Sequence, residues 1–164
     1  QFLKQSENTE RHLKSWQRNK MDRIARITVR EVEYTAFSLA TELMSYDEPI
    51  PEFGTRFPEK LESCIETPHS TYNKEDLYPG LIGKASILFY LMIKNHPFQN
   101  GNKRIAIMTL LYFLFKNDKW LRIGNDDLYS FAKDVAASKH YERSEKIIEI
   151  QKTLKKHLID WEDE

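Results

Sequence analysis

Two apolar segments separated by a short polar one constrain the fold of this chain more than any other feature. Leu81–Lys94 and Ile105–Lys116 carry apolar residues on every side of a helical projection. This pattern is typical of helices that are buried all round, not of surface helices with one wet face. The segment between them, 96–104, is mostly polar. The sequence therefore predicts an all-α domain built around a buried helical pair with a polar connection.

The polar connection contains signals that end one helix and begin the next. Pro97 disfavours the helical conformation at His96, so the first helix is expected to stop there. Gly101 permits a left-handed turn just before the second helix. The unpaired N–H groups of that helix start and the positive end of its dipole form an anion site, to which Lys103 and Arg104 add two cations. These residues predict a cradle for phosphate.

A histidine, an amide and an aromatic residue accompany the predicted cradle. An imidazole titrates near neutral pH, so His96 can take the proton of an incoming hydroxyl group. Asn100 can offer a carbonyl oxygen to a hydrated magnesium ion, although it binds the metal more weakly than a carboxylate would. Phe98 is expected to point into the core and anchor the loop. From chemistry alone, an ordinary helix connection with solvated polar side chains is an equal alternative.

The nine residues from His96 to Arg104, HPFQNGNKR, closely resemble the Fic motif, written H-P-F-x-D/E-G-N-G/K-R. The resemblance covers roughly residues 27–138 and is closest to the death-on-curing (Doc) branch of that family. Family members transfer part of a nucleoside triphosphate, usually AMP, to a protein hydroxyl, whereas the Doc toxin phosphorylates elongation factor Tu. The resemblance implies a Fic-type helical bundle with a small β-hairpin flap. It also implies ATP and Mg²⁺ as cofactors and a protein substrate, with a translation factor among the candidates.

The resemblance assigns a role to each motif residue by position. His96 resembles the general base, Gly101 and Asn102 the anion-hole loop, and Arg104 the phosphate-binding arginine. Lys103 stands where AMP-transferring members carry glycine, as it does in the Doc branch, and this lysine is associated with a reversed nucleotide and phosphate transfer.

Asn100 departs from the family pattern, which has a magnesium-binding Asp or Glu at this position. Three interpretations therefore stay open. The leading one is a Doc-like phosphotransferase that is the toxin of a toxin–antitoxin pair. The second is an AMP-transferring Fic protein. The third is a degenerate module that binds a nucleotide or a partner without catalysis, because a neutral amide cannot offset the charge of the metal as a carboxylate does. A purely structural domain does not account for the motif residues occurring together.

The segment 45–58 precedes the motif and contains Pro49, Pro51, Gly54 and Pro58, a density that excludes a helix. In the Fic family a β-hairpin flap beside the motif docks the target segment by strand addition, and this stretch resembles it in order and composition. The resemblance predicts a short hairpin here, with target-docking residues that we expect to be Ile50 and Phe53. An ordinary surface loop is an equal alternative.

The remaining segments predict further helices around the pair. Thr28 and Glu31 have the spacing of a capping box before a helix from about 29 to 44. Other helices are expected at 59–67, after Gly124, and from about 141 to 159. We divide the chain into an N-terminal helical extension (1–26), a Fic/Doc core (27–138) and a C-terminal helix that packs on the core (139–164). His69 lies in a predicted polar loop, and a single histidine in such a loop is more often solvated than catalytic.

Inhibition can be internal or external in proteins of this kind. Fic proteins often carry an inhibitory helix with the pattern S/T-x-x-x-E-G/N, and Ser6 with Glu10, or Ser138 with Glu142, match only its serine–glutamate spacing, which often arises by chance. Doc-type proteins rely instead on a separate antitoxin chain. The resemblance therefore adds an antitoxin to the candidate partners.

Composition narrows the partners and the compartment. The chain has 25 basic and 25 acidic residues, so nothing in its charge indicates a nucleic acid or a membrane surface as partner. The single cysteine, Cys64, excludes an internal disulfide framework and is consistent with a reducing compartment. Neither apolar run reaches the roughly 18–20 uninterrupted apolar residues of a membrane span, and no signal-peptide pattern is present. We therefore expect a cytoplasmic protein.

Overall fold

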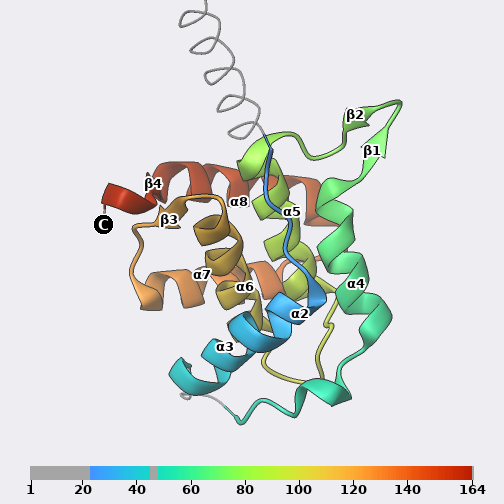
Figure 1. Ribbon diagram of the computed structural model, residues 1–164, viewed down its shortest axis with the longest axis vertical. Coiled ribbons are helices and arrows are strands. Elements are labelled where there is room, and N and C mark those ends of the chain that lie inside the picture. The colour runs from blue at the N-terminus through green and yellow to red at the C-terminus, as the bar shows by residue number, and fades with distance from the viewer. Residues whose placement is uncertain (1–22, 45–47, 164) are drawn as a thin grey trace, which may run out of the picture.

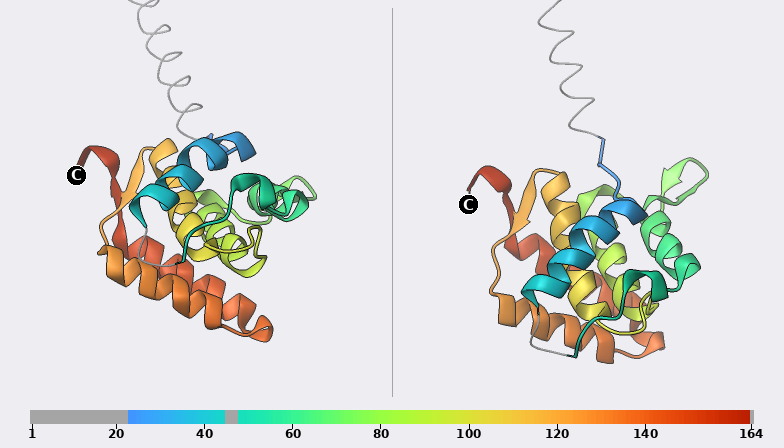
Figure 2. Two further views of the ribbon diagram at one scale, coloured as in Figure 1. Left: turned by 90° about the horizontal axis from the view of Figure 1, so that it is seen from below. Right: turned by 60° about the horizontal axis from the view of Figure 1, so that its bottom comes forward.

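The computed structural model describes residues 23–44 and 48–163, and two helices that pack against each other form its centre. These are α5 (Gly80–Lys94) and α6 (Asn102–Lys116). Every residue of α5 from Gly83 to Ile93 is buried, as is most of α6. In Figure 2 the pair lies between helical segments on both sides. The mainly helical fold and its buried pair, both predicted from the sequence, are confirmed.

The first helical run lies against α6 (Figure 1). Its helical pitch changes along its length. It consists of α2 (Val29–Glu31), the π-helical segment η1 (Val32–Phe37) and α3 (Ser38–Leu43). Its fully buried side chains are Val32, Ala36 and Ala40, spaced four residues apart on one face. The extent of the predicted helix is confirmed. The π-helical turn was not predicted, because apolar spacing over so few residues does not distinguish the two pitches.

The segment between α3 and α4 corrects the predicted position of the hairpin. Residues 48–57 contain no strand; they form the 3-10 turn η2 (Phe53–Thr55) and lead into α4 (Pro58–Glu66). Phe53 is only 8% exposed, and its ring lies 5.3 Å from that of Phe37 and 5.8 Å from that of Phe98. Burial of this aromatic side chain in the core fixes the segment without strand pairing. The side chain of Phe53 is therefore part of the core and does not face a target.

The hairpin that the structure does contain lies further along the chain. Strands β1 (Thr71–Tyr72) and β2 (Glu75–Asp76) pair antiparallel after α4 and the 3-10 turn η3 (Thr67–His69). Asn73 and Lys74 between the strands have φ values of 49° and 65°, as a two-residue type I′ turn requires. The sequence predicted a polar loop here, because lysine gives little signal for a left-handed conformation. In Figure 1 this hairpin lies beside the N-terminal end of α5, at the opposite end of that helix from the polar connection.

The C-terminal part covers the other side of the pair. Helix α7 (Asn125–Ala137) packs on α5 and α6, and α8 (Arg143–His157), which follows the 3-10 turn η4 (His140–Glu142), packs on α5. Strand β3 (Lys119–Leu121) follows α6 and pairs antiparallel with β4 (Leu158–Asp160), before the final turn η5 (Trp161–Asp163). The predicted last helix therefore ends two residues early, because Leu158 and Ile159 pair with β3. The predicted extension 1–26 lies, except for 23–26, outside the described residues.

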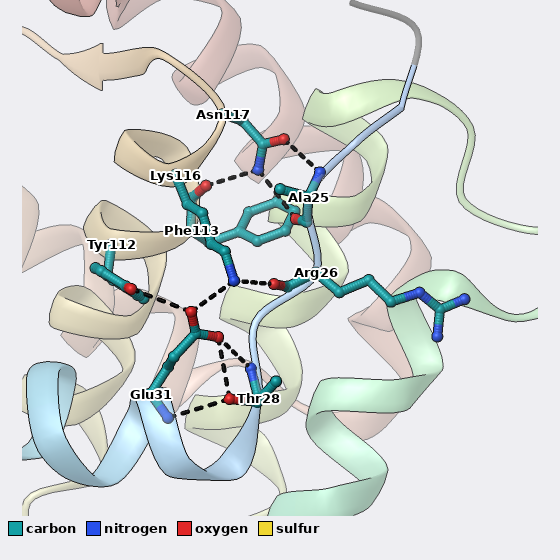
Figure 3. Close-up of polar contacts among 8 residues, drawn as sticks. All are labelled: Ala25, Arg26, Thr28, Glu31, Tyr112, Phe113, Lys116 and Asn117. Carbon is teal, nitrogen blue, oxygen red and sulfur yellow. Dashed lines mark hydrogen bonds and ion pairs between the residues drawn. The ribbon is translucent and has the colours of Figure 1, made fainter. Parts of the chain in front are cut away.

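The chain enters the fold along the C-terminal end of α6, where side chains of α6 and of its C-cap hold it (Figure 3). Asn117 accepts a hydrogen bond from the N–H of Ala25 (2.7 Å) and donates one to its carbonyl oxygen (3.2 Å). Lys116 donates to the carbonyl oxygen of Arg26 (2.6 Å) and forms an ion pair with Glu31 (2.5 Å). These contacts join segments that are about ninety positions apart.

Glu31 is the centre of this network. Its carboxylate accepts a hydrogen bond from the N–H of Thr28 (2.8 Å), which completes the predicted capping box. The carboxylate also accepts a hydrogen bond from the hydroxyl of Tyr112 (3.2 Å). Burial raises the pKa of Glu31, but the hydrogen bonds from Lys116 and Thr28 outweigh burial and hold the pKa below its usual value of 4.5. A carboxyl group whose pKa is lowered by folding stabilises the fold above its unfolded pKa. That contribution is lost as pH falls through the folded pKa.

We expect Glu31→Gln to lower the free energy of unfolding by about 1 kcal/mol at pH 7, because the variant loses a charged cap and an ion pair. The difference from the wild type should shrink as pH falls below 4.5. Urea denaturation at a series of pH values measures it, with the exposed Glu42→Gln of the same helical run as control. The same deficit at pH 3 as at pH 7 would contradict the assigned role.

Candidate functional site

The polar connection begins where α5 ends. Asn95 caps the helix, and His96 follows with a φ of 48°, a left-handed conformation that costs a residue with a Cβ atom about 1–2 kcal/mol. The predicted end of the first helix before His96 is confirmed. The side chain of His96 is exposed. Lys94 donates hydrogen bonds to the carbonyl oxygens of Ala136 (3.1 Å) and Ser138 (2.5 Å), which join this end of α5 to the end of α7.

Phe98 and Asn102 hold the connection in place. Phe98 is 3% exposed and contacts the rings of Phe37 and Phe53. The side chain of Asn102 accepts a hydrogen bond from the N–H of Phe98 (2.9 Å) and donates one to its carbonyl oxygen (2.8 Å). The amide of Asn102 thus satisfies two buried backbone groups of the loop. What Asn102 offers to a ligand is its backbone N–H at the start of α6.

The N-cap residue of α6 is a glycine, which has no side chain to cap the helix. Gly101, at the N-cap, has a φ of 78°, so the predicted left-handed turn is confirmed. The first hydrogen bond of the helix joins the N–H of Ile105 to the carbonyl oxygen of Gly101 (2.9 Å). The backbone N–H groups of Asn102, Lys103 and Arg104 therefore have no partner within the helix. Such a helix start binds anions through these N–H groups and the positive end of the dipole.

A cavity of about 170 Å³ opens at this helix start. It is smaller than the roughly 300 Å³ of a typical ligand pocket, so it suits a phosphate group better than a whole nucleotide. The sequence did not single out the residues that α5 and α7 add to its wall. The structure brings six of the predicted site residues to the wall of this one cavity: His96, Asn100, Gly101, Asn102, Lys103 and Arg104.

Arg104 forms hydrogen bonds with the backbone of the loop between α3 and α4. It is 3% exposed, and its guanidinium donates hydrogen bonds to the carbonyl oxygens of Met44 (3.1 Å) and Glu48 (2.6 Å). In this structure the arginine that the resemblance assigned to phosphate therefore fixes the loop before α4. Its positive charge still contributes to the potential in the cavity that it lines. Lys103 is half-buried on the same wall.

Asn100 is engaged on both sides of its amide. Its side-chain oxygen accepts a hydrogen bond from the N–H of Gly101 (2.8 Å), and its side-chain nitrogen donates to the carboxylate of Glu48 (3.3 Å). The oxygen that the sequence assigned to magnesium thus already has a backbone partner. No pattern in the sequence pointed to Glu48, because its approach to Asn100 depends on the folded loop.

Ile50 lies against the motif, whereas His69 lies elsewhere. A Cβ atom at position 101 would be 2.6 Å from Cγ1 of Ile50, so this side chain covers Gly101. His69 belongs to η3, near the start of α5, and its ring meets that of Phe113 edge-on at 6.4 Å. Burial lowers the pKa of His69. His69 does not line the cavity at the motif.

The serine–glutamate spacing at the end of α7 serves local structure. The hydroxyl of Ser138 donates to the carbonyl oxygen of Val135 (2.6 Å), and the carboxylate of Glu142 accepts from the N–H of Lys139 (2.5 Å). Glu142 thus caps its own 3-10 turn. The other pair, at positions 6 and 10, lies outside the described residues.

The Fic/DOC family model matches residues 8–114, which is more than half of the chain and includes the whole motif. This chain belongs to the Fic/DOC family. Members of the family generally transfer groups derived from nucleotides to proteins. Neither the curated proteins nor the solved structures include a match to this chain. Within 23–44 and 48–163 no helix is both long and apolar enough to cross a membrane.

We expect Gly101→Ala to lower the free energy of unfolding by about 1–2 kcal/mol, because alanine is strained at a φ of 78° and its Cβ would collide with Ile50. Gly54→Ala is the matched control, since its Cβ would meet nothing within 4 Å and its φ is ordinary. Urea denaturation compares the two variants. Truncation of Ile50 to alanine should reduce the additional cost of Gly101→Ala but not abolish it, because the backbone strain stays. Equal stability of the two glycine variants would contradict both the strain and the collision.

Proposed function

We propose that this protein is a transferase that moves a phosphoryl group from a nucleoside triphosphate to a hydroxyl group of a target protein. The observation that carries the proposal is the cavity shared by an exposed histidine, His96, and the uncapped start of α6. A phosphate would lie on the free N–H groups while His96 faces the acceptor. Lys103, on the wall of the cavity, favours phosphoryl transfer over AMP transfer through the resemblance to the Doc branch.

The proposed reaction needs few groups from the protein. The imidazole of His96 takes the proton of the target hydroxyl while the oxygen of that hydroxyl forms a bond to the γ-phosphorus. The bond between that phosphorus and the bridging oxygen breaks, and the nucleoside diphosphate leaves with the electron pair. The N–H groups at the start of α6 and the charge of Lys103 stabilise the negative charge on the transferred group, which is how enzymes gain most of the rate of phosphoryl transfer.

Mg²⁺ and ATP are the cofactors that we propose. Among the described residues no group of three or more His, Cys, Asp or Glu side chains could hold a metal ion. The protein therefore offers no metal cage of its own there, but Mg²⁺ that accompanies phosphates needs only one or two protein ligands. The carboxylate of Glu48, which accepts a hydrogen bond from the amide of Asn100 on the cavity wall, fits that requirement. When bound, the ion would neutralise charge on the phosphates.

The partners in the proposal follow from the chemistry and the resemblance. The acceptor is a protein hydroxyl, with a translation factor among the candidate targets, and an antitoxin chain would be the inhibitor. Ile50 remains a candidate for contact with the target, because it lies on Gly101 beside the cavity.

The first test is incubation of the purified protein in a cell lysate with Mg²⁺ and ATP labelled at the γ- or the α-phosphate. Gel autoradiography should show a labelled protein with the γ label alone. His96→Ala should reduce that band by about 100-fold or more, because it removes the general base. His69→Ala, at the other end of α5, should leave the band unchanged. A band of wild-type intensity with His96→Ala would refute the proposed role of this histidine.

A second candidate function rests on the engaged amide of Asn100. A module that binds ATP in calorimetry but labels no protein with either form of ATP would have lost catalysis for want of a carboxylate at position 100. A band from the α label would instead identify AMP transfer. The same pair of labels thus separates the three interpretations.

We expect Lys103→Gly to move the label from γ to α, because glycine stands at this position in the AMP-transferring members that the motif resembles. Lys103→Arg is the matched control: it keeps a long cationic side chain and should keep the γ label. Calorimetry with ATP checks that both variants still bind the nucleotide. An unchanged γ label with Lys103→Gly would show that position 103 does not choose the product.

A further inference from the structure

A carboxylate from outside the motif lies against the residue that departs from the family pattern. The Glu48 carboxylate accepts a hydrogen bond from the side-chain nitrogen of Asn100 at 3.3 Å, although the two residues are 52 positions apart in the chain. Asn100 is part of the cavity wall at the start of α6. The fold thus brings a negative charge to the edge of the proposed phosphate site.

The motif itself holds the backbone of Glu48 in this place. Arg104, buried in α6, donates to the carbonyl oxygen of Glu48 (2.6 Å) and to that of Met44 (3.1 Å). Two residues further on, Ile50 packs on Gly101. The position of Glu48 therefore depends on buried groups of a long helix, and this is the kind of support that a ligand-binding side chain needs.

The charges at positions 48 and 100 complement each other. Two carboxylates at the distance that separates these side chains would repel each other without a cation between them. A neutral Asn100 avoids that repulsion and orients the carboxylate of Glu48 through its N–H group. The amide oxygen of Asn100 is meanwhile bonded to the N–H of Gly101. The negative charge that a divalent cation requires is therefore present on Glu48 and absent from Asn100.

We propose that Glu48 is the anionic protein ligand of the divalent cation that accompanies the nucleotide, in place of an acid at position 100. The inference rests on the proposed nucleotide-dependent function. A hard cation such as Mg²⁺ prefers carboxylate oxygen and binds through one or two such groups together with phosphates and water. Asn100 is then a positioning residue, and the acidic metal ligand belongs to the loop that Arg104 holds and not to the motif.

Binding of Mn²⁺ in the presence of ADP tests the proposal without any transfer reaction. Mn²⁺ shares the preference of Mg²⁺ for oxygen ligands, and its free concentration is measured by electron paramagnetic resonance. Glu48→Gln should weaken Mn²⁺ binding at least about 10-fold, because it removes the charge but keeps the shape and a hydrogen-bond acceptor. Glu52→Gln is the matched control: Glu52 is an exposed acid of the same loop, and this variant should bind Mn²⁺ as the wild type does.

The double variant Glu48→Gln with Asn100→Asp separates a ligand from a structural residue. It returns the charge to position 100 and should recover most of the lost Mn²⁺ affinity. Loss in the single variant without recovery in the double variant would assign Glu48 to loop structure and overturn the proposal, as would equal Mn²⁺ affinity of wild type and Glu48→Gln. Fluorescent ADP binding without metal is measured in parallel. A wild type that binds no nucleotide would refute the proposed function itself. If Glu48→Gln binds ADP as the wild type does, a negative result with Mn²⁺ refutes only the role of Glu48 as metal ligand.

Discussion

The packing of α5 against α6 is the constraint on which the rest of this structure depends. Both helices are buried on nearly all sides, so other segments must cover them: α2 to α3 on one side, and α7 with α8 on the other. The short connection between them cannot be buried without partners for its backbone polar groups. It therefore lies at one end of the pair, where the uncapped N-terminus of α6 opens onto a cavity.

The connection is held by polar groups that bond to one another. Asn102 satisfies both backbone groups of Phe98, and Asn100 bonds to the N–H of Gly101. Arg104 also joins α6 to the start of the loop between α3 and α4, because it donates a hydrogen bond to the carbonyl oxygen of Met44. The backbone N–H groups at the helix start have no partner within the helix, and they face the cavity together with His96 and Lys103. Site chemistry and loop structure thus use the same short stretch of chain.

Patterns that act over a few residues could be predicted from the sequence. The buried pair, the capping box of Thr28 and Glu31, the left-handed turn at Gly101 and the end of α5 before His96 all follow from local periodicity or from single-residue conformational preference. The spacing of the motif also placed its residues on one helix end. The hairpin was misplaced, because the resemblance to the family flap put it at 45–58 whereas Asn73 and Lys74 give only a weak turn signal.

The sequence by itself determined the helical pair, the polar connection and the family. Only the tertiary structure decided that Phe53 enters the core and that β4 cuts short the last helix. It also decided that Arg104 bonds to the loop and that Glu48 meets Asn100. The physical reason is the sequence separation over which each interaction acts. Helix caps, turns and the periodic pattern of a helix depend on residues that are neighbours in the chain. Burial of an aromatic ring, or the meeting of two side chains 52 positions apart, depends on how the other helices pack.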